Sequence, residues 1–240
     1  MQLNIMCFFI ILVISYTALS ASEQSISQVE ENDSASNLPK YHILSNADRY
    51  TSLGKMSLID LGIVGGAWIP NGPLRIVGSH PMFGFFIGGG KDGFFLDFSL
   101  IFKFLDTKDG YYVSINDSLI MTKYFFGGYF AMDSKIKLFR ISNNEIDLLL
   151  GIGYDGWDTF NDAEKENYDG NGINTINLNA GIGYRLYSFI FEGLVWIISP
   201  ELRYNWTWYG KSNRGGTDLT GNVITANLSI GLGARLKQQL

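Results

Sequence analysis

Hydrophobic and polar residues alternate with a period of two in the segment FFLDFSLIFKFL, residues 94–105. One set of alternate positions holds only Phe and Leu, and the other includes Asp97, Ser99 and Lys103. Successive side chains of a β-strand point to opposite sides, so this pattern predicts a strand with one apolar and one partly polar face. Eight segments are predicted to be such strands: residues 55–69, 82–90, 94–105, 119–132, 145–156, 174–187, 195–209 and 222–236.

The connections between these segments differ in length and composition. Residues 91–93 form a tight turn, whereas residues 106–118, 157–173 and 210–221 are long, polar and rich in turn-forming residues. Short turns at one end and long loops at the other are typical of outer-membrane barrels, whose strands cross the bilayer in about 9–11 residues. Residues 133–144 are an exception, because a short turn is expected there; this segment either extends a strand or forms a helical turn.

Glycine indicates which face of the strands lies inside. In three of the segments a pair of glycines shares the polar face, opposite a face of large apolar residues. The concave side of a small barrel is crowded, so glycine and the polar face belong inside, and the apolar face meets lipid. The chain is thus predicted to be an all-β, closed, antiparallel, up-and-down transmembrane barrel of about eight strands. The glycine pairs are Gly151 and Gly153, Gly181 and Gly183, and Gly231 and Gly233. The alternative, a soluble barrel with its apolar face around a ligand, is disfavoured by this arrangement.

The same alternation points acidic and basic side chains into the lumen in nearly matched numbers. Eight strands enclose a space that side chains can fill, and buried charges need partners. We therefore expect an ion-pair network that plugs the lumen, with Lys123 as a further candidate. The expected members are Asp60, Asp97, Lys103, Asp147, Asp155, Arg185, Glu201, Arg203 and Arg235.

The segment 195–209 also carries a membrane-interface pattern. Trp196 lies near one end of its apolar face, and Trp206 and Trp208 lie near the other, as in the two aromatic girdles of outer-membrane barrels. Pro200 has no N–H to donate to a neighbouring strand, so a local irregularity is expected there.

The ends of the chain and its composition add to this interpretation. Residues 1–21 contain no charged side chain and have the apolar run of a secretory signal peptide. Residues 22–52 form a polar leader that is expected to be flexible. Residues 53–240 remain for the barrel. The single cysteine, Cys7, lies in the signal segment. The net charge of −5 argues against nucleic-acid binding.

These features together resemble the small outer-membrane β-barrel proteins of Gram-negative envelopes. The last strand, SIGLGARL at 229–236, is similar to the C-terminal signal that the barrel-assembly machinery binds, and GAWIPNGPL at 66–74 and NRGGTDLTGN at 213–222 resemble recurrent segments of uncharacterised barrels. The resemblance covers about residues 53–240. It implies an outer-membrane location and contact with bilayer lipid and with the assembly machinery, but no reaction.

Residues with catalytic potential are few. His80 follows Ser79 in the first loop, but no acid nearby in the sequence would orient the histidine, and a packing role is expected. The acidic residues at 158–169 do not have the spacing of a calcium loop. No catalytic, cofactor or metal residue is predicted. We expect a non-enzymatic structural or interaction protein, which contacts an envelope partner through its loops or leader and is suited to be an accessory subunit of an envelope complex. The alternatives are a lipid-modifying enzyme and a narrow solute pore.

Overall fold

The computed structural model describes residues 57–91, 93–115, 118–141, 143–160, 172–191, 193–209 and 216–236. The predicted signal peptide and leader lie outside the described residues, as do most of the acidic loop and the last four residues of the chain. Within the described part, no helix is long and apolar enough to cross a membrane.

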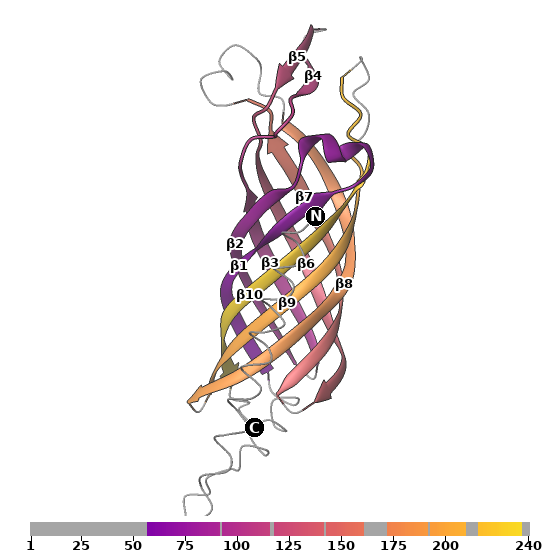
Figure 1. The fold of residues 1–240 in the computed structure, drawn as a ribbon. Coiled ribbons are helices and arrows are strands. Elements are labelled where there is room, and N and C mark those ends of the chain that lie inside the picture. The colour runs from indigo at the N-terminus through magenta and orange to yellow at the C-terminus, as the bar shows by residue number, and fades with distance from the viewer. Residues whose placement is uncertain are drawn as a thin grey trace, which may run out of the picture. The chain divides into compact units, whose positions relative to one another are not determined.

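Eight strands form a closed antiparallel barrel in the order β1-β10-β9-β8-β7-β6-β3-β2, as Figure 1 shows. The barrel closes between its first and last strands, where Ile63 lies opposite Ile230. Every barrel strand thus has a partner on each side, and the predicted fold is confirmed. The strands are β1 (Ser57–Pro70), β2 (His80–Lys91), β3 (Phe94–Lys103), β6 (Phe126–Ile141), β7 (Asn144–Asp158), β8 (Gly172–Phe191), β9 (Leu194–Thr207) and β10 (Asn222–Leu236).

The two ends of the barrel are built differently. At one end, tight turns join β2 to β3, β6 to β7 and β8 to β9, and Gly93 and Gly193 take the positive φ angles of 88° and 89° that such turns require. At the other end the connections are longer. One contains the 3-10 helix η1 (Gly72–Val77), and another contains the hairpin of β4 (Tyr111–Ile115) and β5 (Ser118–Thr122). This hairpin stands above the barrel mouth in Figure 1.

The predicted strand 119–132 is wrong in its boundaries. Residues 118–122 belong to the loop hairpin, and the barrel strand β6 begins at Phe126 and continues to Ile141. The segment 133–144 therefore extends a strand, one of the two possibilities that its sequence left open. A β-bulge between Lys137 and Phe139 shifts the register of β6 against β7. The period of two continues through Asp133 and Lys135 up to this bulge, which interrupts it only in the last residues of the strand.

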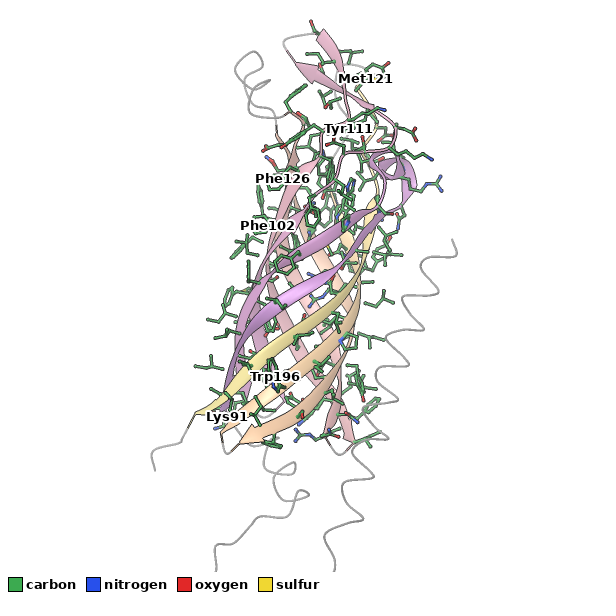
Figure 2. All side chains as sticks on the ribbon, turned by 60° about the vertical axis from the view of Figure 1, so that its left-hand side comes forward. Lys91, Phe102, Tyr111, Met121, Phe126 and Trp196 are labelled. Carbon is green, nitrogen blue, oxygen red and sulfur yellow. The ribbon has the colours of Figure 1, made fainter. Side chains whose placement is uncertain are left out.

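Alternation between outside and inside holds along the barrel wall. In β3, for example, Phe94, Phe98 and Leu100 are exposed, whereas Asp97, Ser99 and Lys103 are buried. The outer surface is covered with large apolar side chains such as Leu61, which is 60% exposed. Figure 2 shows Phe102 and Phe126 on this outer wall, between Lys91 and Trp196 at the short-turn end and Tyr111 and Met121 at the other.

Pro200 interrupts one strand ladder. The register of β8 with β9 runs from Gly183 opposite Glu201 to Leu186 opposite Ile198, and the two pairs between them, at Pro200 and Ser199, do not form. On its other side Pro200 pairs with Leu228 of β10. The ladder is thus interrupted over two pairs at the proline, which has no N–H to donate, and the register on either side is unchanged.

Candidate functional site: the lumen and its mouth

The lumen holds the predicted charged residues whose side chains are described. Asp60, Asp97, Lys103, Asp147, Asp155, Arg185, Glu201 and Arg203 are all buried. Arg235 lies in β10, but its side chain lies outside the described part of the structure. Lys123 is exposed in the loop before β6 and does not enter the lumen, because the strand expected to carry it inward begins three residues later.

A first cluster closes the short-turn end and is called here the floor. Arg185 donates hydrogen bonds to both oxygens of Asp147, with N–O distances of 2.5 and 2.7 Å, and forms an ion pair with Glu145 at 3.1 Å. Its guanidinium carbon lies 4.0 Å from the ring centroid of Phe95, and the Tyr187 hydroxyl donates to Glu145 at 2.8 Å. The floor is thus an ion-pair cluster in which the guanidinium group of Arg185 binds two carboxylates and packs against an aromatic ring.

A second cluster crosses the middle of the lumen and is called the belt. Lys135 Nζ lies 2.6 Å from Asp97 Oδ2 and 2.7 Å from Glu201 Oε1. Arg203 lies 2.6 Å from Asp133 Oδ1 and 2.7 Å from Glu201 Oε2. Glu201 therefore connects the two cations, and the five side chains form a continuous chain of charges across the barrel.

Three members of these clusters were missed at the sequence level. Asp133 and Lys135 lie just beyond residue 132, where the predicted strand ended, and they continue the alternation of Ala131 toward the lumen. Glu145 shares the alternation of Asp147, so its inward direction could have been found by extending that pattern by one step toward the turn.

Glycines make room for the belt. One row of paired residues runs across neighbouring strands, and each of its two glycines lies beside an acid. A side chain at Gly88 would collide with the carboxylate of Asp97, and one at Gly151 would collide with that of Asp133. The glycines on the polar face thus provide the volume that the buried carboxylates occupy. The row is Asp60, Gly88, Asp97, Asp133, Gly151 and Asn179.

A third cluster lies below the mouth, the end of the barrel that carries the longer connections. It combines one ion pair with aromatic rings and is called the aromatic cluster. Lys103, 0% exposed, forms an ion pair with Asp155. Its Nζ lies 4.7 Å from the ring centroid of Trp68, 5.7 Å from that of Phe125 and 5.6 Å from that of Trp157. The cation is therefore held by one carboxylate and by the faces of aromatic rings, an arrangement that the sequence pattern did not predict.

The loop hairpin closes the mouth above this cluster. Trp157 Nε1 donates to the Tyr111 hydroxyl at 3.1 Å, and that hydroxyl donates to the carbonyl of Tyr124 at 2.9 Å. Thr122 of the same hairpin donates to the carbonyl of Thr159 at 2.6 Å. Burial raises the pKa of Tyr111 above its ordinary value, so this hydroxyl stays protonated and able to donate.

The space left in the lumen is small. A cavity of about 30 Å³ lies between the belt and the aromatic cluster, and its lining includes Phe86, Asp97, Tyr129 and Asn227. One water molecule needs at least about 10–15 Å³ by this measure, so the cavity holds about two.

His80 is part of the packed mouth. Its ring is 3% exposed and stacks on Phe125 with a centroid distance of 3.7 Å and an interplanar angle of 8°. Nε2 lies 2.8 Å from the carbonyl oxygen of Val77, while the neighbouring Ser79 is exposed. The two side chains thus point in different directions and do not form a nucleophile–base pair.

Trp196 and Trp206 of β9, and Trp208 just after it, lie on the outer surface. Trp196 follows the tight turn, Trp206 lies at the other end of the strand, and Trp208 comes just beyond it; all three are exposed. Aromatic side chains therefore mark both ends of the apolar wall on this strand.

No protein-family model and no curated protein matches the sequence. Among solved structures, Neisserial surface protein A is 11% identical over 75% of this chain and 97% of its own, with a TM-score of 0.44. The N-terminal β-barrel domain of Pseudomonas aeruginosa OprF is 12% identical over 75% and 98%, with a TM-score of 0.39. The outer membrane protease OmpT of Escherichia coli is 6% identical over 75% and 96%, with a TM-score of 0.34. Sequence identities and TM-scores this low support no conclusion about the activity or the partners of this chain.

The architecture of the barrel indicates in which compartment of the cell the protein lies. A closed antiparallel barrel with an outward apolar wall, a polar interior, short turns at one end and longer connections at the other is the architecture of outer-membrane barrels. An apolar surface of this extent would not be stable in water, and every barrel strand is paired, as a bilayer requires. The chain is an integral β-barrel protein of the outer membrane.

Proposed function

We propose that the protein is a non-enzymatic outer-membrane barrel with a plugged lumen, which acts by presenting its long loops to a partner outside the bilayer. In this proposal the floor, the belt and the aromatic cluster keep the barrel rigid. Trp196, Trp206 and Trp208 anchor the outer wall at the two membrane–water interfaces. The last strand, β10, would engage the barrel-assembly machinery during insertion. The role would suit an accessory subunit of an envelope complex.

The observation that carries the proposal is the two-faced loop hairpin. On its inner face, Tyr111 and Val113 are buried against the mouth. On its outer face, Tyr112 lies opposite Met121, and Leu119 lies two residues further along β5. These three side chains are 49%, 58% and 49% exposed. The bilayer covers the apolar side chains of the wall, but the outer face of the hairpin lies beyond the strands that cross it.

The hairpin is also held firmly, which favours binding. Tyr112 N donates to Thr217 Oγ1 at 2.8 Å, and Thr217 N donates to the Tyr112 carbonyl at 3.0 Å. The loop between β9 and β10 thus fixes the first strand of the hairpin. A surface that is ordered before binding loses less conformational entropy on contact with a partner.

Photo-crosslinking in intact cells tests the proposal. A photoreactive amino acid at Met121 should give protein adducts, whereas the same group at Leu61, which is equally exposed but lies on the bilayer wall, should give lipid adducts only. With the photoreactive group kept at position 121, replacing Tyr112 and Leu119 with serine should strongly reduce the protein adducts and leave the folded barrel intact. The absence of protein adducts at Met121, together with altered lipid A or phospholipid profiles in a deletion strain, would favour a lipid-modifying enzyme instead.

A further inference from the structure

Two carboxylates approach each other at the belt, on either side of a glycine. Asp60 of β1 and Asp97 of β3 lie on either side of Gly88 of β2, in the same row of strand partners. Both are 4% exposed. Their Oδ1 atoms converge over the glycine: a Cβ at position 88 would lie 2.8 Å from Asp60 Oδ1 and in collision with Asp97 Oδ1. Neither Oδ1 atom has a hydrogen-bond partner among the side chains and backbone groups that the structure describes.

The surrounding charges do not balance this pair. The belt contains two cations, Lys135 and Arg203, which already contact Asp97 Oδ2, Asp133 and Glu201. In the floor, Arg185 is engaged by Asp147 and Glu145. Among the described ion pairs, Asp60 has none. Two neighbouring carboxylates in a buried site cannot both remain ionised without a positive charge between or beside them.

We propose that one monovalent cation, either a proton or an alkali ion, is bound between Oδ1 of Asp60 and Oδ1 of Asp97. A single positive charge satisfies both unpartnered oxygens and offsets the excess acid of the belt. A divalent ion fits less well, because calcium takes about 6–8 oxygen ligands and no third acidic or histidine side chain joins the pair among the described residues. The adjacent cavity, which Asp97 and Ser99 help to line, has room for the waters that would complete an alkali-ion shell.

The site has defined charged neighbours. Lys135 of β6 contacts Asp97 and also forms an ion pair with Glu201 of β9, and Arg185 of the floor lies in β8. Arg235 stands two positions from Gly233, the strand partner of Asp60, and its side chain lies outside the described part. Any test of the site must therefore separate a bound ion from a contact with Arg235.

The test measures how the stability of the full chain, folded in lipid vesicles, depends on each ion. The ratio of folded to unfolded protein in urea is read from the two gel bands. Proton activity is varied near neutral pH at constant sodium, and sodium or potassium is varied at constant pH and ionic strength. For one ion bound only by the folded form, the ratio rises up to about tenfold per tenfold increase in that ion. If the ratio changes with proton activity, the first arm of the test, the bound ion is a proton. If it changes with sodium or potassium concentration, the second arm, the bound ion is an alkali ion.

Two variants make the test specific. Asp60→Asn removes one negative charge and supplies an amide that can donate to Asp97 Oδ1, so it mimics the occupied site. The slope should disappear in this variant, and its stability should be no lower than that of the native chain at low ion activity. Asp147→Asn is the matched control, because Asp147 is a fully paired lumen acid; it should lower stability and leave the slope unchanged. If a proton is bound, an infrared band of a protonated carboxyl group should be present in the native chain and absent in Asp60→Asn.

Three results would overturn the proposal. One is equal slopes for the native chain and Asp60→Asn in both arms, and another is no slope in either arm. The third is that Arg235→Gln lowers stability as much as Asp60→Asn and the double variant lowers it no further. That third result would make Arg235 the counterion of Asp60.

Discussion

Gly151 of β7 is the strand partner of Asp133 of β6, and the carboxylate of Asp133 occupies the space that a side chain at position 151 would need. The same relationship links Gly88 with Asp97. Small residues on the polar face thus allow a narrow barrel to bury carboxylates together with their cationic partners, and the lumen fills without an open channel.

Gly151→Ala should therefore destabilise the barrel by about 1–3 kcal/mol, because the added methyl group overpacks the belt. The urea dependence of the folded gel band measures this change. Gly128→Ala is the control: Gly128 is exposed on the outer side of β6, and nothing lies within 4 Å of an added Cβ. Equal effects of the two substitutions would show that position 151 is not crowded.

Lys103→Met should cost about 3–5 kcal/mol of stability, because it leaves the carboxylate of Asp155 buried without its partner. The double variant Lys103→Met with Asp155→Leu should regain part of that loss, since it removes both charges. Lys123→Met, on the exposed lysine of the loop, should change stability little. A double variant that is less stable than the single one would contradict this account of the aromatic cluster.

Tyr111→Phe should loosen the loop hairpin, because it leaves Trp157 Nε1 and the Tyr124 carbonyl without their shared partner, at a cost of about 1–3 kcal/mol. Limited proteolysis within the hairpin should become faster, while the exposed Tyr112→Phe should have no such effect. In the native chain, the raised pKa of Tyr111 makes this contribution complete below about pH 10, the ordinary tyrosine value, and weaker as the pH rises further. Protease resistance that does not change above that pH would be inconsistent with this role.

The filled lumen predicts electrical silence. In a planar bilayer the native protein should give no discrete channel openings, because the floor, the belt and the aromatic cluster obstruct the lumen in series. Replacing Phe125 and Trp157 with alanine should leave the bilayer silent, since the two lower clusters remain. Regular openings of the native protein would instead support a narrow solute pore.

Much of this architecture could be predicted from alternation, because the period of two reports directly which side of a strand faces the lumen. Predicting which residues would pair was harder. Asp133 and Lys135 were missed because residues 118–122 have strand character but belong to a loop, so the predicted barrel strand began too early and ended at residue 132. The aromatic surroundings of Lys103 depend on Phe125, which comes from that loop. Alternation within a strand carries no information about a side chain that a loop brings into the barrel.

The central claim is that the apolar face points outward into a membrane. It is tested most directly by comparing the migration of the protein from the outer-membrane fraction on a gel, with and without boiling in detergent. A closed barrel in which every strand is paired should resist unboiled detergent and migrate as a compact species that shifts on heating. A protein found in the soluble fraction, with no heat-dependent shift, would mean that the apolar face lines an internal cavity and that the polar face is outside.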